Sequence, residues 1–349
     1  MESPPIAPGL PYLALNRGVL PVIADRLGAG MIMKRLYETA ETLIYDPVPS
    51  NRNATRASLY ALGFRKVELA PTLDLLQARL RSRAPDLLLA EIAGSESEVC
   101  AAIQAVRQGH LGDNPFVVIV ATTWRCDGAN VGLALNSGAD DLIARPVSTA
   151  VLRERIKGLA ERRKDFVITS DYIGPDRRRE ARGPGATCVE VPNPFNVRTR
   201  ANLGEQEAER AIAEAVQRGK DMLNREKLRH DAMQLCLQWR MLEQTTPGGR
   251  DFREILPRIA RVASEIKWRG TIAKQDAVLK PCDLVAESVQ ALLAMAGRIE
   301  DSGVRPVLSV LGHVVLTLGH MFAPDEVEPD GLVDLDRVMA GRSSRPVAA

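Results

Sequence analysis

Residues 85–91, with the sequence PDLLLAE, and residues 116–121, with the sequence FVVIVA, decide the fold of this chain. Each contains a short apolar run without the polar alternation of a half-exposed strand. Such runs, bounded by polar residues, are typical of strands that are covered on both faces. The two stretches therefore predict central strands of a parallel sheet.

The surrounding sequence extends this pattern on both sides. Three further strand-like runs lie at residues 42–45, 66–69 and 141–144. Five amphipathic stretches alternate with the strands, at about 51–62, 72–82, 95–109, 128–137 and 148–163. Strands that alternate with helices of about 10–15 residues form βαβ units. Residues 41–163 are therefore predicted to be an α/β domain with a doubly wound, five-stranded parallel sheet.

The rest of the chain divides by composition. Residues 1–40 begin Pro-rich and predict an N-terminal extension with a short helix, and residues 324–349 predict a mobile tail. Residues 164–203 are rich in Arg, Pro and Gly and predict a linker, either solvated or docked back on the α/β domain through residues 171–178. Residues 204–323 contain about four helical patterns, the first of them long, and predict an all-α bundle.

Composition limits the function classes. The 349 residues carry 46 basic and 44 acidic side chains, whereas nucleic-acid-binding proteins usually show a clear basic excess. Five scattered cysteines without CxxC spacing and four histidines predict neither a zinc site nor disulfides. The longest apolar run, residues 304–322, contains polar residues throughout, so we expect a soluble, cytoplasmic protein without a membrane segment. The usual Gly-rich, nucleophile-elbow and metalloprotease motifs are absent from the sequence, so no enzyme activity is predicted.

Several polar motifs lie at or after the ends of the predicted strands of the α/β domain. They are residues 45–52 (YDPVPSNR), the end of 85–91, Thr123 after the fourth strand and residues 136–146 (NSGADDLIARP). Their order, and the spacing of 22 residues between Thr123 and Arg145, resemble the receiver domain of two-component response regulators. The resemblance covers about residues 41–163. It implies a pocket formed by Asp46, Pro47, Glu91, Thr123 and Arg145.

Three of these positions depart from the family pattern of an acidic pair, an acceptor aspartate and a lysine. Pro47 takes the place of the second acid and offers no oxygen to Mg²⁺, so we expect no metal and no other cofactor. Glu91 replaces the acceptor and is one methylene longer, and Arg145 replaces the lysine and suits a carboxylate partner. We expect Glu91 to pair with Arg145, directly or through water, and to mimic an acyl phosphate. An ordinary ion pair without mimicry is the alternative.

A fainter resemblance lies in the helical region. Residues 259–271 (IARVASEIKWRGT) resemble a histidine-phosphotransfer helix, with Ser264 in the position of the histidine and Lys267 three residues later. Serine cannot form the phosphoimidazole of the relay, so Ser264 and Lys267 would mark a degenerate phosphotransfer position. An unrelated bundle is the alternative. His313 and His320 are expected to be core or interface groups rather than metal ligands.

These observations predict an atypical, pseudo-receiver response regulator that transmits a signal by protein–protein contact, through the family's contact face at about residues 128–163. The resemblance implies a histidine kinase, a phosphotransfer protein or a downstream effector as partner. Homodimerisation through the long helix stays open. The alternatives are a phosphorylation-competent regulator, with Asp46 or Asp86 as acceptor, and a DNA-binding regulator.

Overall fold

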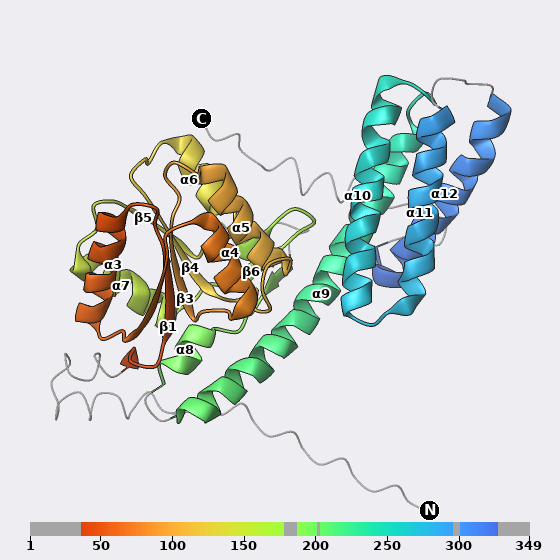
Figure 1. Cartoon of the computed structure of the whole chain (residues 1–349). Coiled ribbons are helices and arrows are strands. Elements are labelled where there is room, and N and C mark those ends of the chain that lie inside the picture. Colours follow the sequence, from red (N-terminus) through yellow and green to blue (C-terminus); the bar gives the residue numbers. More distant parts are fainter. Residues whose placement is uncertain (1–35, 178–186, 201–202, 296–300, 327–349) are drawn as a thin grey trace, which may run out of the picture.

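The computed structural model describes residues 36–177, 187–200, 203–295 and 301–326 (Figure 1). The predicted N-terminal helix before residue 36 and the predicted tail after residue 326 lie outside the described residues. The described part contains an α/β domain (residues 41–161), a segment that we call the strap (162–177 and 187–200), and a helical bundle (205–295 and 301–326).

The α/β domain is built on a five-stranded parallel sheet with the order β2-β1-β3-β4-β5. Its strands are β1 Glu41–Tyr45, β2 Lys66–Ala70, β3 Leu87–Glu91, β4 Val118–Thr123 and β5 Asp141–Ala144. All residues of β3 and β4 are buried, as their apolar runs predict. The order reverses between β1 and β3, and ligand sites of such sheets lie beside that point, at the carboxyl ends of the strands.

Helices cover both faces of this sheet, which confirms the doubly wound prediction (Figure 1). One face packs against α3 Pro49–Leu62 and α7 Thr149–Glu161. The other packs against α4 Leu73–Ser82, α5 Glu96–Gln108 and α6 Gly128–Asn136. Alternate residues of β3 serve the two faces: Leu87 and Leu89 join the first core, and Leu88 and Ala90 the second.

The strap is folded, and the expectation of a linker missed this. It contains the strands β6 Phe166–Ile168, β7 Ile173–Pro175 and β8 Thr187–Val189, in an antiparallel sheet of order β7-β6-β8, and the short helix α8 Pro194–Arg198. Phe166, Ile168 and Ile173 share a core with Phe116 of the α/β domain. Phe195 stacks on Tyr37 and Phe64. The short strands of the strap thus contain buried aromatic and β-branched residues, although the segment as a whole is rich in Arg and Pro.

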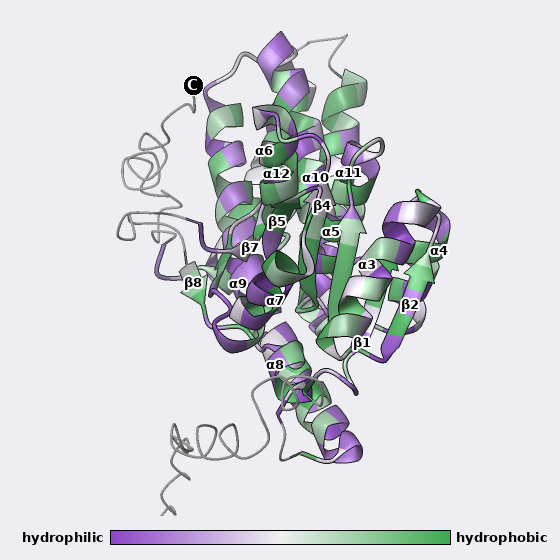
Figure 2. Cartoon of the chain, turned by 90° about the vertical axis from the view of Figure 1, so that its left-hand side faces the viewer, coloured by the Kyte–Doolittle hydropathy of each residue, from purple (hydrophilic) through white to green (hydrophobic). Residues whose placement is uncertain are grey.

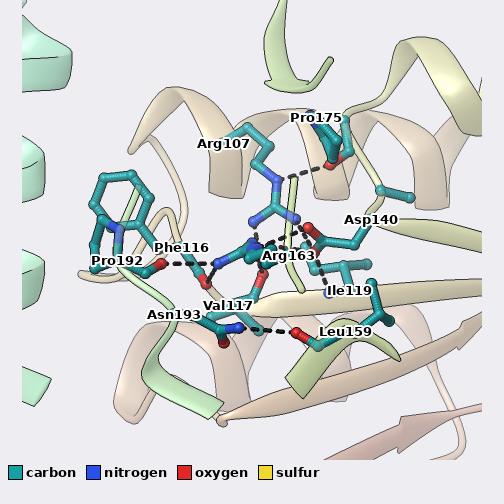
Figure 3. Close-up of polar contacts among 12 residues, drawn as sticks. Arg107, Phe116, Val117, Ile119, Asp140, Leu159, Arg163, Pro175, Pro192 and Asn193 are labelled. Carbon is teal, nitrogen blue, oxygen red and sulfur yellow. Dashed lines mark hydrogen bonds and ion pairs between the residues drawn. The ribbon is translucent and has the colours of Figure 1, made fainter. Parts of the chain in front are cut away.

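A buried charge cluster, Arg107–Asp140–Arg163, joins the strap to the α/β domain (Figure 3). Arg163 donates from Nε to Asp140 Oδ1 at 2.9 Å, and Arg107 donates from Nη2 to Asp140 Oδ2 at 2.8 Å. Both guanidinium groups also bond backbone carbonyls and lie about 5 Å from the Phe166 ring centre. Burial alone would raise the pKa of Asp140, but Arg163 and Arg107 outweigh it and lower this pKa. The side chain of Arg163, at the start of this Arg-rich segment, is thus only 3% exposed.

Residues 171–177 of the strap lie against the α/β domain, as the docked alternative predicted. The guanidinium of Arg177 donates to the carbonyl of Ala139. A Cβ placed on Gly138 would lie 2.4 Å from the carbonyl oxygen of Ile173, so only glycine permits this close approach. Gly138 also has a φ of +90°, which L-amino acids with side chains rarely adopt.

The helical bundle consists of four long helices around one core: α9 Glu205–Glu243, α10 Arg250–Ile272, α11 Leu279–Met295 and α12 Asp301–Phe322. A short 3-10 turn, η1 Asp276–Val278, precedes α11. The first half of α9 runs beside the α/β domain and its second half joins the bundle (Figure 1). Figure 2 shows hydrophobic residues along the central strands and mixed hydropathy along the bundle helices. The prediction of a helix-rich second half is confirmed.

Residues Gly303–Phe322 of helix α12 are apolar enough to cross a membrane, by length and composition only. In this structure it packs in the bundle, where Leu311, Val315 and Leu318 are buried. His313 and His320 lie on its exposed face. They are therefore not core groups, because seven residues make two helical turns and return both to the same outward side, and the alternative that they are interface groups stays a prediction.

The crossing of α9 over the α/β domain yields a prediction. A Cβ on Gly219 would lie 2.7 Å from Cε2 of Phe116 and 2.8 Å from Cδ of Pro192. Gly219→Ala is expected to lower the free energy of unfolding by about 1–3 kcal/mol, despite alanine's higher helix propensity. Gly158→Ala in α7, where a Cβ meets no atom within 4 Å, is the matched control and should stabilise by up to about 1 kcal/mol. Urea unfolding measures both, and equal stabilisation would contradict the close crossing.

Candidate functional site

The candidate site lies where the carboxyl ends of β1, β3, β4 and β5 meet. Asp46 directly follows β1, Glu91 is the last residue of β3, and Arg145 directly follows β5. The register pairs Glu91 with Thr122 of β4. Parallel strands end at the same edge of the sheet, so residues far apart in the sequence converge there.

Arg145 is the centre of this site. Its Nε donates to Oε2 of Glu91 at 2.5 Å, and its Nη2 donates to Oδ2 of Asp46 at 3.1 Å. Nη2 also lies 3.2 Å from Oγ1 of Thr55 in α3. The side chains of Arg145, Asp46 and Glu91 are 7%, 0% and 2% exposed. The structure thus brings Glu91 and Arg145 into direct contact, and Asp46 joins them.

The remaining acceptors of the two carboxylates are also used. Oε1 of Glu91 accepts from the backbone N–H of Ala93 at 3.0 Å, and Oε2 accepts from the hydroxyl of Thr122 at 2.9 Å. Oδ1 of Asp46 accepts from the N–H of Val48 at 2.9 Å. Burial raises the pKa of both carboxyl groups, and these hydrogen bonds and Arg145 oppose it. All four carboxylate oxygens of Asp46 and Glu91 therefore have hydrogen-bond partners within the molecule.

Two expected pocket residues lie elsewhere. The hydroxyl of Thr123 bonds the backbone N–H and carbonyl of Arg125, whereas the hydroxyl that reaches Glu91 belongs to Thr122. Successive residues of a strand point to opposite sides, so a displacement by one residue changes the partner. Pro47 is exposed in the turn before α3 and presents no polar side-chain atom to the site. The adjacent pair Thr122–Thr123 was the only sequence signal for Thr122, and Thr55 had none.

The donor set at this site does not fit a divalent metal ion. Mg²⁺ requires several oxygen ligands in near-octahedral geometry. Here the guanidinium of Arg145 already contacts an oxygen of each carboxylate, and Pro47 adds none. Among the described residues, no group of three or more His, Cys, Asp or Glu side chains is placed to hold a metal.

Asp86, the alternative acceptor, lies outside this network, directly before β3 at the amino ends of the strands. Its Oδ2 accepts from Nε of Arg198 in the strap at 3.1 Å and from the N–H of Glu41 at 2.9 Å. Burial raises the pKa of Asp86 to about 6, opposed by Arg198. These contacts give Asp86 a structural role in holding α8 against the sheet.

The residues of the phosphotransfer resemblance lie on α10, and neither contacts the pocket. Ser264 is exposed, and its hydroxyl donates to the carbonyl of Ala260 one turn earlier at 2.9 Å. Lys267 pairs with Asp283 of α11. The kinship of this helix with phosphotransfer domains stays a prediction.

Comparison with known proteins gives one curated relative and several solved structures. The chain is 29% identical over 111 residues to the transcriptional regulatory protein CseB of Streptomyces avermitilis, a match that covers 32% of this chain and 45% of that protein. The chain thus spans less than half of the length of this relative. No family model matches the chain.

Two of the similar solved structures are described as receiver domains. One is a response regulator signal receiver domain from Bermanella marisrubri, 21% identical, with a TM-score of 0.31; it covers 35% of this chain and 98% of that chain. Another is a CheY-like receiver domain from Methanospirillum hungatei, 25% identical, with a TM-score of 0.31; it covers 34% of this chain and 90% of that chain. The strand order β2-β1-β3-β4-β5, with helices on both faces, is the doubly wound order of CheY. Residues 41–161 of this chain therefore have the doubly wound fold and strand order that CheY shares.

Proposed function

We propose that this chain is a pseudo-receiver response regulator that transmits its signal by protein–protein contact, without phosphorylation at the usual site and without Mg²⁺. The observation that carries the proposal is the position of Arg145, whose guanidinium bonds both Glu91 and Asp46. A positive charge thus already lies between the two carboxylates. No catalytic activity of its own is needed for this role, and we expect it to act in the cytoplasm.

The proposal predicts that the pocket is chemically inert. Incubation of the full chain with acetyl phosphate and Mg²⁺ should add no stable phosphoryl group, as measured by intact-mass spectrometry, because Glu91 is buried and ion-paired. A conventional receiver domain is the positive control for the reagent. Stoichiometric, Mg²⁺-dependent incorporation at any residue of the pocket would overturn the proposal.

A triple variant tests the cause of this inertness. Pro47→Asp, Glu91→Asp and Arg145→Lys together would restore the acidic pair, the shorter acceptor and the lysine of the family pattern. This variant is expected to gain Mg²⁺-dependent phosphorylation. Arg155→Lys, an equivalent change at an exposed position of α7, should leave the chain inert.

The contact surface that we propose is formed by α6, β5 and α7 and the loop before α6. Trp124 is 51% exposed, Leu133 42% and Val151 47%, so this face presents apolar side chains to solvent. Exposed apolar groups of this size favour a protein partner over a nucleic acid. A signalling protein, either a kinase, a phosphotransfer protein or an effector, is the partner that fits the fold.

A role in gene regulation is a second candidate, favoured by the match to CseB. Direct DNA binding through the arginine-rich segment is less well supported, because Arg163 and Arg177 already bond Asp140 and Ala139 within the molecule. Phosphate contacts make DNA binding steeply dependent on salt. Binding of generic duplex DNA at low salt that is lost at high salt would support direct binding, and its absence at low salt would exclude it.

A further inference from the structure

The end of α5 is held in a socket of the helical bundle. Gln108 is the last residue of α5, and Arg269 of α10 donates from Nη2 to its backbone carbonyl and to its side-chain Oε1, each at 3.0 Å. Nη1 of Arg269 donates to Oδ1 of Asn224 in α9 at 3.0 Å, and Nε lies 2.7 Å from Glu265 Oε1. The Arg269 side chain is 1% exposed.

This contact is favourable for two physical reasons. The last carbonyls of a helix lack partners within the helix and carry the negative end of its dipole, so a guanidinium is a suitable cap. A buried guanidinium in turn needs acceptors for its N–H groups, because an unmade hydrogen bond to a buried charge is costly. If Gln108 withdrew, Arg269 would lose two acceptors together. Arg269 therefore has both Gln108 acceptors when α5 is docked on the bundle, and neither when α5 is displaced.

The residues that follow α5 strengthen the contact. Gly109, with a φ of +81°, turns the chain so that His110 reaches the bundle. The His110 ring meets the Trp268 ring edge-on at 4.3 Å between centroids, and its Nε2 lies 3.2 Å from Oε2 of Glu265. Trp268, Arg269 and Glu265 are consecutive or one turn apart on α10, so one stretch of that helix holds the end of α5.

The other end of α5 is tied to the pocket. Glu91 ends β3, and its Oε1 accepts from the N–H of Ala93 in the short connection to α5. The 13 residues of α5 make a rod about 20 Å long. The carboxylate of Glu91 thus lies next to the N-terminal end of α5, and the guanidinium of Arg269 contacts its C-terminal end. Any displacement of the β3–α5 connection in response to the pocket would move Gln108 relative to Arg269.

We infer that α5 is the output connection of the α/β domain and that the helical bundle is its resident partner, which reads the state of the Glu91–Arg145 pair at Arg269. This inference rests on the proposed function, since it takes the ion pair as the signal-bearing state. It adds a second output, within the chain, to the exposed face of α6, β5 and α7. The bundle moves with α5 rather than as a freely tethered domain.

Hydrogen–deuterium exchange of the full chain tests the coupling. Glu91→Gln removes the charge but keeps the shape, and it should raise the exchange rates of the amides at 108–111 and 269–272 by about fivefold or more. Glu98→Gln, the same change at an exposed position of α5, is the matched control and should leave both segments unchanged. Increased exchange confined to the pocket, or to α6, β5 and α7, would overturn the inference.

The reverse experiment does not depend on the stability of the pocket variant. Gln108→Met removes the side-chain acceptor of Arg269 and keeps an unbranched side chain of similar length. Because energetic coupling is reciprocal, it should raise the exchange rate of the Ala93 amide, which bonds Glu91. An unchanged Ala93 amide would overturn the coupling and leave the inert pocket intact. Phosphorylation by acetyl phosphate would instead overturn the proposed function. It would not change what the exchange rates show about the contact between α5 and the bundle.

Discussion

Asp140→Ala is expected to lower the free energy of unfolding by about 3–5 kcal/mol. The carboxylate neutralises Arg107 and Arg163, whose side chains are 0% and 3% exposed, and it also accepts from the N–H of Ile119. Its removal leaves two buried guanidinium groups without a counterion. Urea unfolding followed by circular dichroism measures the loss.

The adjacent aspartate supplies the control. Asp141 pairs with Arg155, whose side chain is 54% exposed, so Asp141→Ala is expected to cost less than about 1 kcal/mol. The two variants remove the same atoms at neighbouring positions and differ in the burial of the partners. Similar losses for both would show that the cluster contributes no more than a surface ion pair.

The Asp140 variant should also loosen the strap. The ion pair with Asp140 holds Arg163 in the orientation in which it bonds the carbonyls of Phe116 and Pro192. Proteolysis at low protease concentration is therefore expected to cleave the variant near residues 162–177 sooner than the wild type. Asp141→Ala should leave the cleavage rate unchanged.

Arg145→Met is expected to destabilise the chain by about 3–5 kcal/mol at pH 8, and by less at pH 5. Asp46 and Glu91 are buried, and burial raises the pKa of both carboxyl groups even with Arg145 present. Without the guanidinium, both pKa values rise further. A carboxyl group whose pKa is higher in the folded than in the unfolded chain favours folding at low pH, where it is protonated in both states, and this contribution is lost as the pH rises through the folded-state pKa.

The measurement is the urea midpoint of wild type and variant at several pH values between 5 and 8. The difference between them should grow with pH. Arg155→Met, at an exposed ion pair of α7, should give a small difference that does not depend on pH. A pH-independent loss in Arg145→Met would mean that packing of the side chain, rather than its charge, stabilises the pocket.

The pocket shows how far spacing along the chain can predict a site. Asp46, Glu91 and Arg145 each end or follow an apolar run, and parallel strands bring such ends together, so their convergence was predictable. The contact between Glu91 and Arg145 follows from their charges. Thr122 was missed in favour of Thr123, because the side of the sheet on which a residue lies depends on the register, and register requires the neighbouring strand.

The fold of the strap and the contact between Gln108 and Arg269 could not be predicted from the sequence, for another reason. The composition of residues 164–203 is polar, and its three strands have only three residues each, too few for a periodic pattern. Arg163 and Arg269 look like surface arginines in the sequence. Their burial depends on acceptors contributed by Asp140 and Gln108, which lie 23 and 161 residues away.

The sequence by itself determined the doubly wound sheet, the helical second half and the meeting of Glu91 with Arg145 at the carboxyl ends of the strands, because apolar periodicity and the polar ends of strands are local properties of the chain. Only the tertiary structure decided that Asp46 completes the Arg145 network, that the strap is folded and that α5 ends in the bundle. Those features depend on burial and on hydrogen bonds between distant residues. Such contacts form only after the chain has packed, so no local pattern in the sequence predicts them.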